Sequence, residues 1–147
     1  MKRQHRVGCG HKALGLALGV QPEKVREVAD KFVGRHRGVG LYDHEVEMLA
    51  RRMGGAVIEE NVTRELRTIN SFGRKRQRWL GPTAASYVRM LQERCRAAGA
   101  ENRYILRVSR HFIGVCVGAT GAVSWVGAQT GWMKRARVIN AWLIVTK

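Results

Sequence analysis

Four segments of the chain carry apolar residues at intervals of three and four positions, the spacing that gathers them on one face of a helix. These segments are residues 9–18, 22–33, 43–53 and 83–98. Their ends carry suitable residues, because Pro22 suits a first helical position and Asp43 suits an N-cap. Pro82-Thr83 opens the last segment, and Gly19, Gly54 and Gly99 stand just past the ends of three of them. The pattern therefore predicts four helices in the first hundred residues.

The rest of the chain consists of short apolar runs between turn residues, which is typical of strands. The predicted strands are 103–108, 111–117, 122–126 and 137–146, with a further short strand at 56–59. Residues 61–82 have no regular spacing and are expected to be irregular. Helices first and an antiparallel sheet last is an α+β pattern. At 147 residues we expect a single domain over 1–147, its helical part about 9–98 and its sheet part about 103–146.

Two segments resemble targeting or membrane sequences. The apolar run 13–20 follows basic residues, but it is short and lacks a small-x-small cleavage site, so we expect no signal peptide. Residues 111–133 contain no Asp, Glu, Lys or Arg and would be long enough to cross a membrane. They also contain five glycines and a polar turn at 118–121, which favours a β-hairpin. We therefore expect no membrane span.

Composition narrows the classes of protein further. Hydrophobic residues make up 45% of the chain, which excludes wholesale disorder. An odd number of cysteines, three, argues against a disulfide scaffold and for a reducing compartment such as the cytoplasm. The net charge is +16, from 27 Lys and Arg against 11 Asp and Glu. Such a charge suits nucleic acid or another polyanion as a partner.

Cys9 is the first candidate for chemistry. It precedes the first predicted helix and is flanked by Gly8 and Gly10. A thiol at a helix N-terminus feels the positive end of the helix dipole, which favours the thiolate, and small neighbours let a substrate come close. The alternative is an inert packing cysteine, and this is our interpretation of Cys95 and Cys116.

His111 is the natural partner of Cys9, because it begins a predicted strand about a hundred residues later. Strand alternation gives it the same face as Ile113, Val115 and Val117, and that apolar face is expected to pack on the helical layer. We therefore expect His111 to point toward the start of the Cys9 helix. A Cys and a His apart in sequence and together in space suit a thiol nucleophile with its base.

At this point the chain resembles small papain-like cysteine-peptidase-type domains encoded by phages and bacteria. The resemblance rests on residues 9–14, 19–22 and 25–28, on Pro82-Thr83 and its helix, on 103–108 closed by His111, and on 135–138 and 141–142. It implies a papain-like fold in which Cys9 is the nucleophile and His111 the base. It also implies a location in the host cytoplasm or in a virion.

The chain departs from that family where the histidine should be oriented. Such domains usually carry Asp or Asn on the strand after the histidine, and here no Asp or Glu follows Glu101. If Val117 pairs with Ala122 across the hairpin, His111 lies opposite Ala128 and the nearest amide is Gln129, which becomes the candidate orienter. Ser124 and Asn140 are further off. For the oxyanion hole, the candidates are the backbone N–H of Cys9 and the side chain of Gln4.

Nothing in the sequence indicates a cofactor. The histidines His5, His11, His36 and His44 form no pair with a cysteine at metal-ligand spacing, so we expect no metal site. The segment 38–40 is too short and badly placed to be a dinucleotide-binding loop.

Two basic clusters each lie beside a tryptophan. The first comprises Arg74, Lys75, Arg76 and Arg78 with Trp79, and the second comprises Lys134, Arg135 and Arg137 with Trp132. Arginines and lysines can follow a phosphate backbone, and an aromatic ring can stack on a base. The alternative is a solvated loop and a charged strand edge.

These observations lead to three hypotheses. The first is a thiol hydrolase, a peptidase or amidase, that acts on a peptide or amide substrate through Cys9 and His111. The second is a non-catalytic papain-like domain that binds nucleic acid or serves in a phage virion. The third is a small nucleic-acid-binding protein of another fold. We favour the first.

Overall fold

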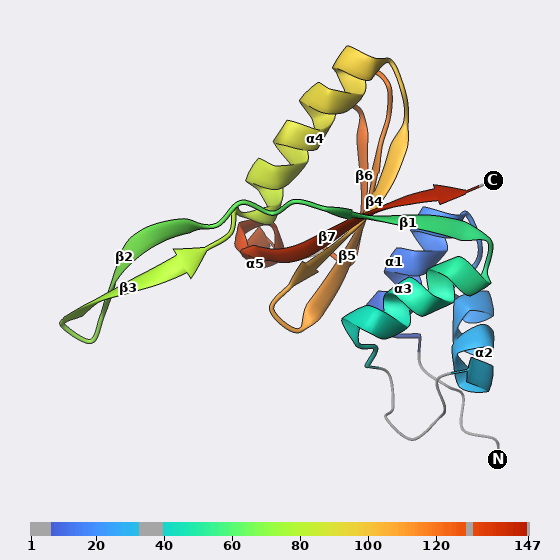
Figure 1. The fold of residues 1–147 in the computed structure, drawn as a ribbon, viewed down its shortest axis with the longest axis horizontal. Helices are drawn as coiled ribbons and strands as arrows, with labels where there is room; N and C mark the ends of the chain where they lie inside the picture. The colour runs from blue at the N-terminus through green and yellow to red at the C-terminus, as the bar shows by residue number, and fades with distance from the viewer. Residues whose placement is uncertain (1–6, 33–39, 129–130, 147) are drawn as a thin grey trace.

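The computed structural model describes residues 7–32, 40–128 and 131–146 (Figure 1). The helices are α1 (Cys9–Leu18), α2 (Pro22–Phe32), α3 (Asp43–Arg52), α4 (Ala84–Ala98) and the short α5 (Gly131–Arg135). The strands are β1 (Gly55–Glu60), β2 (Glu65–Ser71), β3 (Arg74–Leu80), β4 (Asn102–Val108), β5 (His111–Val117), β6 (Val123–Val126) and β7 (Val138–Thr146). The α+β class expected from the sequence is confirmed.

The centre of the fold is a five-stranded antiparallel sheet in the order β1-β7-β4-β5-β6. The hairpin of β2 and β3 forms a second sheet of two strands and projects from this body (Figure 1). Strand β1, from the half of the chain expected to be helical, pairs with β7 at one edge of the large sheet. Among the described residues, no helix combines the length and the apolar character needed to cross a membrane.

Helices cover both faces of the large sheet (Figure 1). On one face, α1, α2 and α3 pack on Ile105, Phe112 and Trp142. On the other face, α4 packs on Tyr104 and Leu106 of β4 and on the odd-numbered residues 113–117 of β5. The expectation of one helical layer is thus wrong in detail, because α4 lies across the sheet from the first three helices.

The ends of the helices follow the predicted chemistry except at Asp43. Gly19 and Gly99 end α1 and α4 with φ values of 71° and 62°, the left-handed conformation that glycine adopts without strain. The Thr83 hydroxyl accepts a hydrogen bond from the Ser86 N–H and caps α4. Asp43 is not the N-cap of α3, because Tyr42 holds that position and the Glu45 carboxylate accepts the Tyr42 N–H at 2.8 Å. The Asp43 carboxylate is thereby left for contacts elsewhere.

Two segments differ from the sequence expectation. Residues 61–82, expected to be irregular, contain the β2–β3 hairpin, whose strands pair along their whole length from Glu65↔Leu80 to Ser71↔Arg74. Residues 131–135, which lie between two predicted strands, form α5. Neither segment is governed by a buried apolar face, and this is why periodicity did not predict them.

Candidate active site

Cys9 is the first residue of α1 and is partly buried against the helical side of the core. Gly8 before it has extended backbone, and its N–H donates a hydrogen bond to Nδ1 of His11 at 2.9 Å. The helix starts at Cys9, so the N–H groups of its first turn have no acceptor within the helix. Cys9 thus stands at the N-terminus of a helix, which is the position predicted from the sequence.

Helix α1 runs along β5 in the same direction as the strand. Near the middle, Gly114 lies so close to α1 that a Cβ at this position would be 2.9 Å from the Cα of Ala13. Further along both elements, Arg103, which pairs with Cys116 of β5, donates a hydrogen bond to the Leu16 carbonyl at 2.9 Å. Because these two contacts come in the same order along α1 and β5, the N-terminus of α1 and the start of β5 lie at the same end of the sheet. Cys9 and His111 occupy these two ends, although no hydrogen bond joins them in the described part of the chain.

The prediction that His111 shares a sheet face with the helix of Cys9 is not supported by the packing. Ile113, Val115 and Val117 pack against α4, whereas α1 covers the opposite face through Phe112 and the gap at Gly114. Strand alternation therefore does not direct His111 toward α1. The prediction put α1 on the apolar face of β5 because it took all helices to form a single layer, whereas helices cover both faces of the sheet.

The imidazole of His111 is held by the main chain. Its Nε2 lies in hydrogen-bonding contact with the carbonyl oxygen of Gly127, just after β6. A carbonyl oxygen only accepts, so Nε2 must carry the proton, and in the neutral ring Nδ1 is then the unprotonated nitrogen. Nothing in a glycine's side chain signals such a role, so sequence reasoning missed Gly127.

The remaining candidates from the sequence have different outcomes. Gln129 and Gln4 lie outside the described residues. The expected pairing of Val117 with Ala122 is wrong, because Val117 pairs with Val123 and the register is shifted by one residue. Ser124 is exposed and pairs with Cys116, and the amide of Asn140 donates to Asp43 at 2.6 Å.

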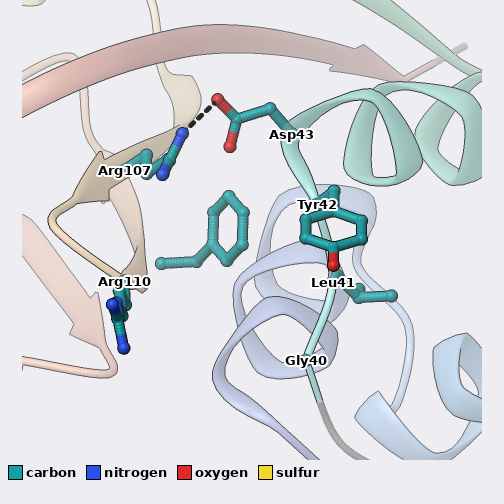
Figure 2. A pocket seen from close by; sticks show the side chains of 7 residues that line it. Gly40, Leu41, Tyr42, Asp43, Arg107 and Arg110 are labelled. Carbon is teal, nitrogen blue, oxygen red and sulfur yellow. Dashed lines mark hydrogen bonds and ion pairs between the residues drawn. The ribbon is translucent and has the colours of Figure 1, made fainter. Parts of the chain in front are cut away.

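A cavity of about 560 Å³ opens beside this end of the sheet, between the start of α3 and the β4–β5 turn (Figure 2). Its lining includes Leu41 and Phe112, with Arg110 at the turn, and Arg107 donates a hydrogen bond to Asp43 at 2.8 Å (Figure 2). Neither Cys9 nor His111 lines it, but Leu41 reaches Gly10, and Phe112 follows His111 in the chain. The cavity is therefore adjacent to the start of α1, whereas strand alternation gives the His111 side chain the face opposite to Phe112.

His11 is a buried histidine that does not belong to the catalytic pair. It is 1% exposed, and burial together with the neighbouring positive charge of Arg26 lowers its pKa to about 4, with Asp30 opposing that shift. Arg26 in turn forms an ion pair with Asp30 at 3.1 Å. His11 is therefore neutral at pH 7 and acts as an acceptor for the Gly8 N–H.

The other two cysteines have different surroundings. Cys95 is fully buried in the core under α4, as expected of a packing residue. Cys116 is only partly buried, and its Sγ lies 2.9 Å from the Glu101 carboxylate. Burial and this carboxylate raise the pKa of the Cys116 thiol, which disfavours its nucleophilic form.

The two basic clusters lie on two elements that meet at the base of the β2–β3 hairpin. The first cluster lies on β3, where every member is exposed. In the second, Lys134 and Arg135 belong to α5, and Lys134 lies over the Trp125 ring. Arg137 bonds to the Gly81 carbonyl at 3.3 Å and so joins the second cluster to the base of the β2–β3 hairpin.

Comparison with known proteins adds no relative, because no family model, no curated protein and no solved structure matches this chain.

Proposed function

We propose that the protein is a thiol hydrolase of papain-like arrangement, a peptidase or amidase, with Cys9 as nucleophile and His111 as base. The observation that carries this proposal is the contact between His111 Nε2 and the Gly127 carbonyl. The chain has no Asp or Glu after Glu101 to orient a histidine, and a main-chain carbonyl can do so instead. The contact supports the proposal because it keeps Nδ1 free to accept a proton.

The reaction would proceed through an acyl-enzyme. Sγ of Cys9 attacks the substrate carbonyl carbon while its proton passes to Nδ1 of His111, and the oxygen becomes an oxyanion. The backbone N–H of Cys9, at the helix N-terminus, can donate to that oxyanion. The C–N bond then breaks, the amine leaves with the proton from the imidazolium, and water hydrolyses the thioester. Apolar or acidic groups of the substrate could occupy the adjacent cavity, where Phe112 and Arg110 are available.

Alkylation by iodoacetamide tests the pair without a known substrate. At neutral pH, we expect Cys9 to react about tenfold faster than Cys116, because the proposed His111 base can take the Cys9 proton whereas the pKa of Cys116 is raised by burial and by Glu101. His111→Ala should slow the alkylation of Cys9 about tenfold and leave the alkylation rate of Cys116 unchanged. Peptide mass spectrometry resolves the three cysteines in one sample.

The matched control is His44→Ala, which removes an exposed histidine of α3 that stacks on Tyr42. It should not change the rate at Cys9. If His111→Ala leaves that rate unchanged as well, Cys9 reacts only because it is accessible and the proposed pair is wrong. That result would favour the non-catalytic papain-like domain considered from the sequence.

A further inference from the structure

The β2–β3 hairpin forms an arm that shares no core with the body of the protein. It is a separate two-stranded sheet that extends away from the large sheet (Figure 1). Nearly all of its residues are exposed, including the large apolar side chains Leu66, Phe72 and Trp79. A two-stranded hairpin is marginal in water without a buried face, so the arm has no evident role in stabilising the fold.

The register of the arm separates its side chains onto two faces. One face carries Arg67 opposite Arg78, Ile69 opposite Arg76, and Ser71 opposite Arg74, and we call it the arginine face. The other face carries Leu66 opposite Trp79, Thr68 opposite Gln77, and Asn70 opposite Lys75. Within 61–82 the only acidic residue is Glu65, which pairs with Arg67 at 3.1 Å. The arginine face is therefore a regular line of cations with one neighbouring carboxylate.

Two features of the arm oppose its own stability. Like charges directly opposite each other on a sheet repel, as Arg67 and Arg78 must. At the tip, Phe72 has a φ of 53° and its side chain is fully exposed. This turn needs positive φ at both central residues, which favours Asn or Gly. Gly73 adopts it without strain, with a φ of 73°, whereas Phe72 adopts it at a steric cost. The strain at Phe72 and the repulsion between Arg67 and Arg78 both lower the stability of the arm, and no buried packing offsets them. This combination indicates a surface that binds a ligand.

We propose that the arm binds double-stranded DNA by entering the major groove, with the arginine face toward the phosphates and base edges and Phe72 at the leading end. The major groove of B-form DNA admits a two-stranded β-ribbon, whereas that of A-form RNA is too deep and narrow for side chains to read. Alternate residues of a strand repeat roughly every 6.6 Å, so Arg74, Arg76 and Arg78 form an evenly spaced line for polyanion contact. At the base of the arm, Lys134 and Arg135 extend the same charge toward the flanking backbone.

The chemistry of the arm favours DNA over an anionic membrane. A membrane-inserting hairpin would present apolar residues along its length, but the face opposite the arginines carries Thr68, Asn70 and Gln77. These hydroxyl and amide groups lose hydrogen bonds in hydrocarbon and can gain them at base edges and phosphates. The proposal is independent of the thiol hydrolase, because neither Cys9 nor His111 takes part.

Fluorescence anisotropy of a labelled duplex of about 20 base pairs, titrated with the full chain at several salt concentrations, tests the proposal. Arg74→Gln, Arg76→Gln and Arg78→Gln combined should weaken binding about tenfold or more and lower the salt slope by about 2.7. The matched control combines Lys24→Gln, Lys31→Gln and Arg89→Gln, three exposed cations on α2 and α4. It removes the same charge and should change affinity less than about twofold. If both triple variants lost the same affinity for the duplex, binding would reflect a diffuse attraction to the positive charge of the whole protein, and the proposal would be overturned.

Phe72→Asn separates the tip from the charges. Asparagine suits the positive φ, so the hairpin should persist, and binding should weaken several-fold while the salt slope stays unchanged. The same chain should bind the duplex more tightly than a single strand of the same sequence or an RNA duplex. The proposal that the arm enters the major groove would be wrong if arm-dependent binding were tighter for single strands, for RNA, or for vesicles of phosphatidylserine and phosphatidylcholine. Cys9→Ala should bind DNA normally, so a failed hydrolase and a failed arm are distinguishable.

Discussion

Lowering the pH from about 7 to 4 should remove about 3 kcal/mol from the free energy of unfolding through His11 alone. The pKa of this histidine is lowered to about 4 in the folded protein, whereas an unfolded chain would have the ordinary 6.5. Between these values the unfolded state binds a proton that the folded state does not. Stability is therefore fully present above pH 6.5 and is lost as the pH falls toward 4. Urea denaturation at the two pH values measures the loss.

His11→Gln is the matched variant for this measurement. Glutamine at the third position of a helix can accept the N–H of the N-cap residue, so the contact with Gly8 can persist without a titrating group. Carboxylates elsewhere titrate equally in both proteins and cancel in the comparison. We expect the variant to lose about 3 kcal/mol less than the wild type between pH 7 and 4. Equal losses would show that His11 is not the acid-sensitive group.

Gly114→Ala should destabilise the protein by about 2 kcal/mol, because the new methyl group has no room. Its Cβ would lie 2.9 Å from the Cα of Ala13 and 3.2 Å from the Ala13 carbonyl oxygen. Both are backbone atoms of α1, so the helix must move off β5. Since Cys9 begins that helix, its alkylation should also become less dependent on His111.

Gly118→Ala provides the control for Gly114→Ala. A Cβ at Gly118 meets its nearest atom at 3.6 Å, which is ordinary contact, so the free energy of unfolding should change by less than about 0.5 kcal/mol. Urea denaturation of both variants decides the point. A loss at Gly118 as large as that at Gly114 would mean that the close approach of α1 to β5 does not set the cost, because Gly→Ala by itself lowers the entropy of the unfolded chain and favours folding.

The helices and most strands could be predicted because burial imposes a period on the sequence. Leu14, Leu49 and Leu91 are fully buried and lie at helical spacing from their apolar neighbours. The two helical layers could also have been predicted. Consecutive apolar residues at 104–106 are typical of a strand covered on both faces, and the structure buries all three.

The arm and the orientation of His111 could not be predicted in this way. The arm has no buried face, so its strands depend on cross-strand pairing and on the turn at Phe72, neither of which produces a period. The His111 ring is held by a backbone carbonyl, and any residue at 127 would supply one. Asp43 is of a residue type that is favoured at N-caps, but it accepts hydrogen bonds from Arg107 of β4 and Asn140 of β7 instead. Such choices depend on tertiary contacts that local sequence does not encode.

The order of the strands in the large sheet has a consequence for how the protein folds. Strand β7 lies between β1 and β4 and, within the described parts of the chain, is the only element that pairs with both. It is also synthesised after each of them, so residues 55–60 and the β4–β5–β6 meander cannot join until residues 138–146 have been made. The helix of Cys9 contacts the strand of His111 directly at Gly114, and it also packs on Trp142 and Ile144 of β7. Local hairpins can form early, but the core beneath α1 is complete only after the long-range pairing of β7.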